Sequence, residues 1–431
     1  MSSTEKKNYL LPIIMMIFLF AMISFVTNLA APMGVVLKNQ FGVSNAMGML
    51  GNFANFIAYA FMGIPAGILL SKIGYKKTAL IAVAVGFTGV GIQYLSGGAG
   101  SFVVYLLGAF VAGFSMCMLN TVVNPMLNTL GGGGKKGNQL IQIGGTFNSL
   151  SATLVPILVG ALVGEVAKAN ITDVYPVMYI AMGIFAAVFI VLSMVQIPEP
   201  HMAKPAEKGV KDKYSALSFR HFKLGAIAIF VYVGIEVGIP GTLNLFLADA
   251  TRGGGLDGTT AGFVTGTYWF LMLIGRFTGA SIGGKVSSKV MLTVASVVGL
   301  VLVLLAIFLP TTQNISMPVF MTDPATGALS FGMTQVPINA MFLVLCGLCT
   351  SVMWGGIFNL AVEGLGKYVA AASGIFMMLV CGGGIMPLLQ NAIADSVGYM
   401  ASYWVVFAGL AYMLYYSAIG SKNVNTDIPV E

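Results

Sequence analysis

A single acidic residue, Glu236, stands inside a long apolar stretch of this 431-residue chain. Between residues 222 and 248 the only other charged residue is Lys223, at the edge of the stretch. A carboxylate near the middle of a hydrocarbon layer is costly, so such residues usually face a cavity and have a function. Tyr232 precedes Glu236 by four residues, so its phenol can reach the carboxyl group. Both side chains are therefore candidates for binding a ligand, and Glu236 is also the candidate for cation coupling.

Three interpretations of Glu236 stay open. The carboxyl group could exchange a cation, it could stay protonated and only bind a ligand, or it could pair permanently with Arg276. At 1.5 Å per helical residue, Glu236 lies about 21 Å and Arg276 about 12 Å above the inner ends of their apolar stretches. This axial difference of roughly 9 Å disfavours a short ion pair. We place Arg276 among the gating candidates instead.

Carboxamide side chains gather in three apolar stretches of the first half of the chain. Asn120 and Asn124 are four residues apart, and Gln142 and Asn148 keep helical spacing with Gly145 between them. Amides form hydrogen bonds with the hydroxyl groups of a neutral ligand, and a Trp ring can stack on its apolar face. The alternative is that each amide only joins neighbouring membrane helices. The candidate substrate-binding residues are Asn28, Asn120, Asn124, Gln142, Asn148, Tyr232, Glu236, Trp269 and Trp354.

The composition places these side chains in a membrane protein. The chain is 57% hydrophobic and only 8% charged, whereas a soluble domain carries roughly 25% charged residues. A helix needs about 20 mostly apolar residues to cross the hydrocarbon core, and twelve stretches satisfy this requirement. The predicted spans are 9–37, 45–70, 77–96, 101–129, 138–164, 174–197, 222–248, 260–284, 289–310, 337–362, 369–394 and 401–420.

Basic residues predict the orientation of these spans. With both termini in the cytoplasm, 17 of the 21 Lys and Arg residues fall on the inner side and only Lys38, Lys168 and Arg252 on the outer side. Such an excess is typical of cytoplasmic loops. The net charge of +7 is therefore explained by topology and by anionic lipid, and we expect no nucleic-acid partner. We expect a multi-pass protein of the plasma membrane, in bacteria the inner membrane.

The longest inner polar segment divides the chain into two sets of six spans. We predict a first half at 1–197, a cytoplasmic linker at 198–221 and a second half at 222–431. Gly-rich stretches follow the fourth span of each half, so the halves resemble each other. The predicted fold class is an all-α integral membrane protein with twelve transmembrane helices in two six-helix, pseudo-symmetric halves. Transporters built from such repeats hold their substrate between the halves near the middle of the membrane.

The turn after the second span contains a sequence motif that is typical of a family of membrane proteins. The sequence GILLSKIGYKK at 67–77 resembles the loop between helices 2 and 3 of the major facilitator superfamily. Ser71 stands where that superfamily usually has an Asp, which helps to close the inner gate. The resemblance makes gating candidates of Gly67, Ser71, Lys72, Gly74 and Lys76, together with Arg276.

Further motifs resemble one branch of that superfamily, the fucose/galactose/glucose permease family of cation–sugar symporters. The resemblance covers nearly the whole chain and implies coupled sugar uptake. In the fucose-transporting members an Asp in helix 1 and a Glu in helix 4 take part in coupling and binding, and Ala31 and Asn120 stand at these positions here. An amide does not take up or release a proton at any relevant pH, so the resemblance implies that the coupling acid is Glu236 in the second half instead of an acid in the first half. The motifs are IPAGIL at 64–69, NTVVNP at 120–125, TFNS at 146–149, YVGIE at 232–236 and GRFTG at 275–279.

These observations predict a secondary active transporter rather than an enzyme. We expect H⁺-coupled or Na⁺-coupled import of a monosaccharide, a hexose such as glucose or galactose, or fucose, by alternating access in a monomer. An uncoupled sugar facilitator and a same-fold transporter of a non-monosaccharide substrate stay open. A membrane enzyme or sensor is disfavoured, because the sequence shows neither a nucleophile–base pair nor a long soluble segment. Four Cys and two His residues form no metal-ligand pattern, and we expect no cofactor or catalytic residue.

Overall fold

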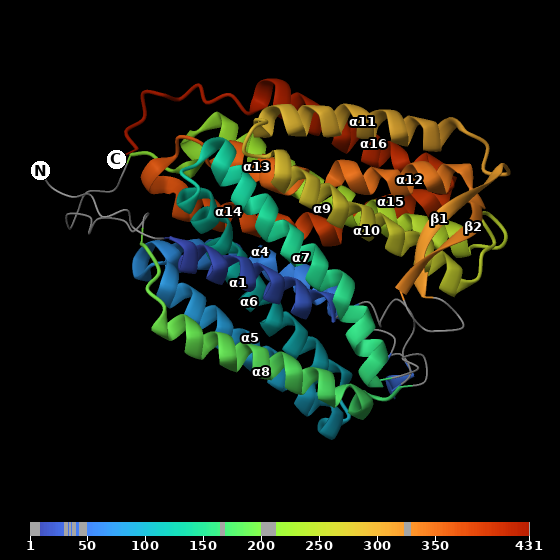
Figure 1. The fold of residues 1–431 in the computed structure, drawn as a ribbon, viewed down its shortest axis with the longest axis horizontal. Helices are drawn as coiled ribbons and strands as arrows, with labels where there is room; N and C mark the ends of the chain where they lie inside the picture. Colours follow the sequence, from blue (N-terminus) through green and yellow to red (C-terminus); the bar gives the residue numbers. More distant parts are fainter. Residues whose placement is uncertain are drawn as a thin grey trace, which may run out of the picture. The chain divides into compact units, whose positions relative to one another are not determined.

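The protein is described here from a computed structural model, drawn as a ribbon in Figure 1. Ala31 and most of the predicted linker 198–221 lie outside the described residues. Within the described part of the chain, ten helical segments are long and apolar enough to cross a membrane. The structure describes residues 9–29, 33, 36, 40–42, 50–163, 169–199, 213–322 and 329–430.

Six long helices correspond to the first six predicted spans. The most polar of them, α7, is not among the ten apolar segments but is 30 residues long, enough to cross the hydrocarbon core. A short 3₁₀ turn, η2 (Ile171–Val174), leads into α8. The helices are α1 (Leu10–Asn28), α4 (Leu50–Ile73), α5 (Tyr75–Ala99), α6 (Phe102–Leu130), α7 (Gly134–Val163) and α8 (Tyr175–Met194).

The second half of the chain contains helices and one β-hairpin. Short 3₁₀ or π turns complete several of the helices: η3 (Ala216–Ser218), η4 (Gly366–Tyr368), η5 (Leu379–Cys381) and η6 (Tyr416–Gly420). The longer elements are α9 (Arg220–Ala248), α10 (Gly258–Ile282), α11 (Ser288–Phe308), β1 (Asn314–Thr322), β2 (Leu329–Pro337), α12 (Ile338–Thr350), α13 (Met353–Val362), α14 (Val369–Met378), α15 (Gly382–Val397) and α16 (Tyr399–Tyr415).

Two predicted spans are interrupted. The stretch 337–362 forms α12 and α13, separated at Ser351 and Val352. The stretch 369–394 forms α14 and α15, with the 3₁₀ turn η5 between them. Three consecutive Gly residues begin α15, and Gly weakens helix propagation. The break therefore lies where the sequence resists a continuous helix.

The chain forms two compact units. The first consists of Met1–Ala216, Gly364–Met378 and Pro429–Glu431, and the second of Leu217–Glu363 and Leu379–Ile428. The broken helix pair thus contributes α14 to the first unit and α15 to the second. The boundaries 197/198 and 221/222 between the predicted halves stay a prediction.

In the first unit, α5 packs against α6 and α8, and α1 packs against α7 and α6 (Figure 1). Helix α4 contacts both α6 and α14. The α4–α14 contact is a backbone-to-backbone approach, because a Cβ atom on Gly67 would lie 2.9 Å from the Cα of Gly374. A Cβ atom on Gly63 would lie 2.6 Å from the carbonyl oxygen of Gly374. Small residues permit such close helix packing in membranes.

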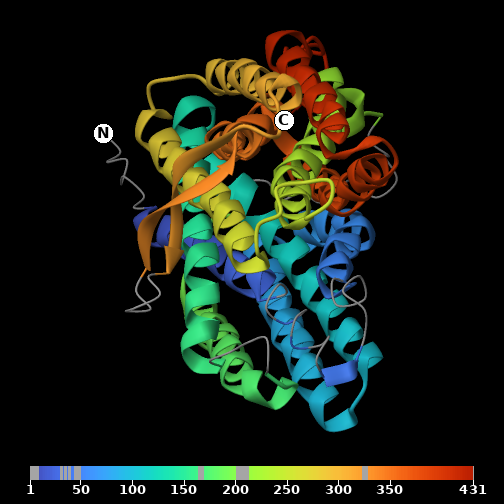
Figure 2. The same ribbon diagram turned by 90° about the vertical axis from the view of Figure 1, so that its right-hand side faces the viewer.

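In the second unit, α9 is the central helix and contacts α10, α12, α13, α15 and α16. Helix α11 covers α12, α13 and α16 (Figure 2). Pro240 lies inside α9 and Pro387 inside α15. Since proline lacks a backbone N–H, each of these helices leaves one carbonyl without its helical donor.

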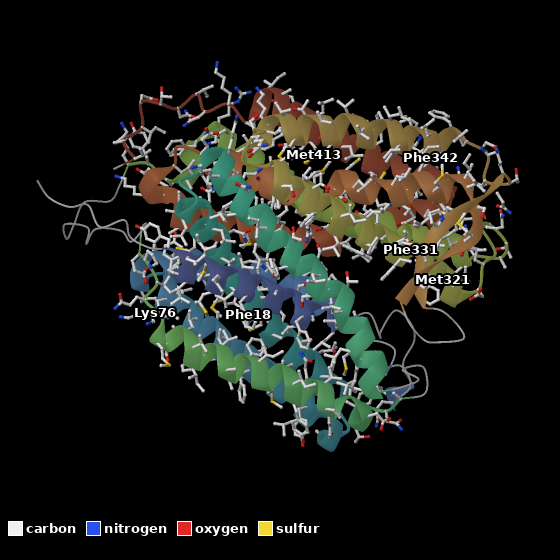
Figure 3. All side chains as sticks on the ribbon, in the orientation of Figure 1. Phe18, Lys76, Met321, Phe331, Phe342 and Met413 are labelled. Carbon is white, nitrogen blue, oxygen red and sulfur yellow. The ribbon has the colours of Figure 1, made fainter. Side chains whose placement is uncertain are left out.

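An antiparallel hairpin of β1 and β2 occupies the long, nearly uncharged stretch 311–336. Phe270 of α10 stacks on Phe320 with ring centroids 4.6 Å apart and meets Phe331 edge-on at 5.2 Å. The backbone N–H of Phe320 also donates a hydrogen bond of 2.9 Å to the Thr267 hydroxyl. These contacts attach the hairpin to α10, as Figure 2 shows, and Figure 3 labels Met321 and Phe331 on it.

The turn after α9 is held by one carboxylate. Asp249 accepts hydrogen bonds from the backbone N–H groups of Thr251, at 2.8 Å, and Arg252, at 3.0 Å. The Tyr399 hydroxyl donates a further hydrogen bond of 3.0 Å. The Arg252 N–H, followed by the Thr251 groups, holds the pKa of the Asp249 carboxyl well below its usual range. This turn therefore keeps its charged carboxylate at any pH in which the protein works.

Candidate functional site

The lone acid of the apolar stretches is part of an ion pair. Arg276 of α10 donates a hydrogen bond of 3.0 Å from Nη2 to Oε1 of Glu236 on α9. The Arg276 side chain is 11% exposed and the Glu236 side chain 14% exposed. Hydrogen bonds between ionised groups are shorter and stronger than neutral ones. The side chains of two apolar helices therefore hold two opposite charges in contact.

This pair overturns the estimate that an axial gap disfavours contact between Glu236 and Arg276. The estimate treated the inner ends of both apolar stretches as one level and ignored the reach of the arginine side chain. The observed bounds do not reduce the counted gap, because α9 begins at Arg220 and α10 ends at Ile282. The inner ends of the two helices therefore do not lie at one level. Arginine also carries its charge at the end of a long stem, which spans the remaining distance.

The backbone of Glu236 makes an additional contact that the sequence reading missed. Pro240 cannot donate to the Glu236 carbonyl, and the Tyr268 hydroxyl lies 3.3 Å from that oxygen as a substitute donor. The same hydroxyl is 2.9 Å from Oγ1 of Thr350 on α12. Three helices thus meet at the backbone of the charged residue. The signal in the sequence is a proline four residues after the only acid of the span.

Aromatic side chains surround the pair. Tyr232 is fully buried, and its hydroxyl lies beside both charged groups. Its ring centroid is 6.3 Å from that of Trp354. Trp269 is 39% exposed and meets Tyr268 edge-on at 5.2 Å. The structure therefore brings Tyr232, Glu236 and Trp354 together and places Trp269 beside them through Tyr268.

The amides of the first unit bridge its helices. Nδ2 of Asn120 donates to the Tyr59 hydroxyl at 2.9 Å, which joins α6 to α4. Nδ2 of Asn124 donates to the Asn120 carbonyl oxygen, also at 2.9 Å. Asn120 is 6% exposed, Asn124 is fully buried and Gln142 is 3% exposed. Asn120 and Asn124 are thus in contact. Tyr59 is a polar neighbour that the sequence analysis did not predict.

Asn28 and Asn148 lie nearer the surface of the first unit. Asn148 donates a hydrogen bond of 2.9 Å to the Phe20 carbonyl, which joins α7 to α1. Asn28 ends α1, and its amide donates to the Ser24 carbonyl at 2.8 Å and to the Ser24 hydroxyl at 3.0 Å. Both side chains are half-buried. These hydrogen bonds use one part of the hydrogen-bonding capacity of each amide. The role of Asn28 and Asn148 in substrate binding stays a prediction.

The signature turn between α4 and α5 is organised by a carboxylate from elsewhere. Glu199 accepts hydrogen bonds from the backbone N–H groups of Tyr75, at 2.6 Å, and Lys76, at 3.1 Å. Gly74 turns the chain with φ at +87°, in the left-handed region that favours glycine. The Lys76 ammonium group donates to the Ser193 carbonyl at 2.7 Å, and Figure 3 labels Lys76 at this end of α5. Glu199 therefore caps the positive end of α5.

The remaining gating candidates have ordinary contacts. The Ser71 hydroxyl donates to the Ile68 carbonyl of its own helix at 2.9 Å. Lys72 is exposed in the last turn of α4, where a cation is favourable, and Gly67 faces α14. Their part in gating stays a prediction.

Metal binding has no support in the part of the chain that the structure describes. No group of three or more His, Cys, Asp or Glu side chains could hold an ion there. All four Cys residues are unpaired and buried: Cys117, Cys346, Cys349 and Cys381.

A family model described as the Major Facilitator Superfamily matches residues 13–387. The chain belongs to the Major Facilitator Superfamily. It is therefore an integral, multi-pass membrane transport protein and not an enzyme.

Two curated relatives match this superfamily member over most of their length. A glucose/galactose transporter of Brucella abortus biovar 1 (strain 9-941) is 29% identical over 428 residues, which cover 98% of this chain and 97% of the relative. An L-fucose-proton symporter of Escherichia coli (strain K12) is 22% identical over 422 residues, which cover 91% and 89% of the two chains.

The fold is also that of a solved superfamily member. The crystal structure of the transporter FucP in the outward conformation matches with a TM-score of 0.80 at 19% sequence identity. The match covers 96% of this chain and 100% of FucP. It confirms the predicted all-α fold with twelve membrane helices, and the resemblance to the permease family is confirmed by the two relatives.

Proposed function

We propose that this protein imports a neutral monosaccharide by cation-coupled symport and alternating access in a bacterial inner membrane. Support comes from the two relatives, one named a glucose/galactose transporter and the other an L-fucose-proton symporter. Glucose, galactose and fucose are pyranoses that present hydroxyl groups around an apolar ring. The candidate substrate-binding side chains are uncharged except for Glu236, which suits a neutral substrate.

The observation that carries the coupling proposal is the Glu236–Arg276 ion pair. Removing two charges from water is costly, and apolar residues of similar volume would often stabilise a fold as well or better. A buried ion pair that adds little to stability is well suited to a part that changes its protonation or its contacts during transport. If a proton or a Na⁺ ion neutralises Glu236, Arg276 loses its partner, and the contact between α9 and α10 changes with the cation.

Sugar binding is proposed for the amides Asn28, Asn120, Asn124, Gln142 and Asn148 of the first unit. In the second unit it is proposed for Tyr232, Trp269 and Trp354. Amide groups can both donate to and accept from sugar hydroxyls, and the indole rings offer flat surfaces for the apolar face of the ring. The protein works as a monomer in contact with membrane lipid.

Inner gating is proposed for the turn between α4 and α5, where Gly67, Ser71, Lys72, Gly74 and Lys76 lie. Both chain termini are proposed to face the cytoplasm, because the basic residues concentrate on that side.

The experiment compares exchange with accumulation in proteoliposomes. Glu236→Gln mimics the neutral carboxyl group, and we expect exchange of labelled for unlabelled sugar to survive while uphill accumulation disappears. A site that cannot change its charge cannot couple sugar movement to a cation gradient. Because the single change leaves Arg276 buried without a counter-charge, the double variant Glu236→Gln/Arg276→Gln serves as the matched control. It should show the same loss of coupling in a well-folded protein.

Uphill accumulation by either variant would exclude Glu236 as the coupling residue. A wild-type protein that equilibrates sugar and never concentrates it would identify a facilitator. The amide at Asn120 favours that second candidate function, because it cannot carry the proton that an acid at this position would carry.

A further inference from the structure

One face of α10 is open above the ion pair. The residues Gly262, Gly266, Trp269, Leu273 and Arg276 follow each other at spacings of three and four, so they lie on one side of the helix. Apart from the neighbouring residues and backbone of its own helix, a Cβ atom added to Gly262 or Gly266 would meet no heavy atom of a described residue within 4 Å. Trp269 is 39% exposed on the same side. We call the part of this side formed by Gly262, Gly266 and Trp269, with the neighbouring Thr265, the open face of α10.

The charged residue Arg276, about two helical turns after Trp269, distinguishes the open face from a lipid-facing surface. Arg276 lies on the same side of the helix and is paired with Glu236. Arginine and glutamate in a membrane span almost always face the protein interior or a water-filled cavity. Ile274, which is 41% exposed, lies on a different side of α10, whereas Phe277, which is 64% exposed, follows Gly266 by about three helical turns and lies on nearly the same side as Gly266.

Polar groups of two helices border the open face. The Thr265 hydroxyl lies 3.5 Å from Oδ1 of Asn244 on α9, and both residues are half-buried. Asn244 follows Glu236 by two helical turns, roughly 12 Å along the helix axis. At the Arg276 end, the buried Tyr232 hydroxyl lies beside the ion pair.

We propose that the open face, together with Asn244, is the sugar-binding surface of the second unit. A neutral pyranose lies over Gly262 and Gly266 and against the Trp269 ring, while its hydroxyl groups bond to Asn244 and Thr265. The two glycines let the ring approach the helix backbone, and the indole covers its apolar C–H groups. This inference rests on the proposed function. It assigns part of the proposed sugar site to Asn244, Gly262, Thr265, Gly266 and Trp269.

The arrangement also supplies a link between the sugar and the coupling pair. Trp269 packs edge-on against Tyr268 at 5.2 Å, and the Tyr268 hydroxyl lies 3.3 Å from the Glu236 carbonyl oxygen. A sugar that moves the indole therefore acts on the residue that holds the backbone of Glu236.

Thiol labelling tests the inference. Gly262→Cys and Gly266→Cys are treated with a membrane-impermeant maleimide, with Gly183→Cys of α8 as the control. Gly183 is also a helical glycine with open space around it, but it lies on an apolar helix of the first unit. The four native Cys residues are buried and give a low background. We expect both α10 thiols to react, the reaction to slow several-fold with the transported sugar, and the control thiol to stay unlabelled.

A second measurement separates contact with sugar from a conformational effect on labelling. Gly266→Val places three additional carbon atoms in the open space and should raise the KM for sugar by about tenfold or more, since even one methylene in a binding pocket has an effect of this size. Gly183→Val should leave KM unchanged. Failure of both α10 thiols to react, a reaction that saturating sugar does not slow, or an unchanged KM for Gly266→Val would each overturn the inference.

The two proposals fail in different ways. If counterflow with the wild-type protein moves no monosaccharide, the proposed function fails and the sugar surface with it. If the wild-type protein transports a sugar that neither protects the α10 thiols nor depends on Gly266, only the inference about the open face fails.

Discussion

At the residue scale, the Glu236–Arg276 pair concentrates the charge of the second unit's interior in one contact. Each partner is largely shielded from water, so removing one leaves the other as an uncompensated charge. Breaking a buried pair in this way typically costs about 3–5 kcal/mol, whereas removing both partners is often nearly neutral. Arg276 therefore has a structural role that can be measured apart from transport.

We predict that Arg276→Gln and Glu236→Gln each lower the thermal stability of the purified protein, and that the double variant recovers most of the loss. The reason is that only the double variant leaves no unpaired charge. Melting temperatures in detergent for the wild type and the three variants complete a double-mutant cycle. Additive losses would mean that the two side chains do not interact energetically, despite their 3.0 Å distance.

The sequence could identify Glu236 but not its partner. A lone acid in an apolar stretch is visible in the residue order, whereas the distance to Arg276 depends on the tilt of two helices and on a side-chain rotamer. The same limit applies to Asn120, whose bond to Tyr59 joins residues 61 positions apart in the chain. The Pro240 effect was readable, because the carbonyl that a proline leaves free is always four residues earlier.

At the element scale, α14 and α4 depend on the absence of side chains between them. A Cβ atom on Gly374 would lie 2.6 Å from the Gly63 carbonyl oxygen and 2.7 Å from the Gly67 Cα atom. Backbone atoms cannot rotate away as a side chain can. The two helices must separate to accept any larger residue.

We predict that Gly374→Val lowers the thermal stability of the protein by an amount typical of overpacking, about 1–3 kcal/mol. Gly183→Val is the matched control, because a side chain there meets open space. Equal melting temperatures for Gly374→Val and the wild type would show that the α4–α14 contact is not a stabilising one.

The helices were largely predictable at this scale, and their interruptions were not. Twelve apolar stretches correspond to helical segments because hydrocarbon leaves a backbone few alternatives. The hairpin was missed although its signal exists: Ile315, Met317, Val319 and Met321 alternate with other residues, as strands require. No element is predicted from the sequence between the spans 289–310 and 337–362. The break between α14 and α15 depends on which unit each half packs against, which no local pattern encodes.

At the scale of the whole molecule, membership of the superfamily rests on the family-model match from residue 13 to residue 387. The fold is shared with FucP. The orientation in the membrane is a separate prediction from the basic residues. Lys77 is exposed at the start of α5, and Thr312 is exposed between α11 and β1.

We predict that a thiol at Lys77→Cys reacts with an impermeant maleimide only after the cells are permeabilised, whereas a thiol at Thr312→Cys reacts in intact cells. Positive loops stay in the cytoplasm, and the uncharged hairpin segment is exported. The wild-type protein, with its buried Cys residues, is the background control. The reverse pattern would invert the proposed orientation of every loop.

The turn at Gly74 restricts how this part of the chain can change. Two independent conditions meet at one position: φ is +87°, and a Cβ atom would lie 2.5 Å from the Glu199 carboxylate. With ψ at 177°, this backbone conformation is one that essentially only glycine adopts, and a Cβ atom of any other residue would also meet Glu199. A smaller residue at 199 clears the space but removes the cap of α5. No single substitution elsewhere in the chain satisfies both conditions. Any mutational path that replaces Gly74 therefore begins with a loss of stability in this turn.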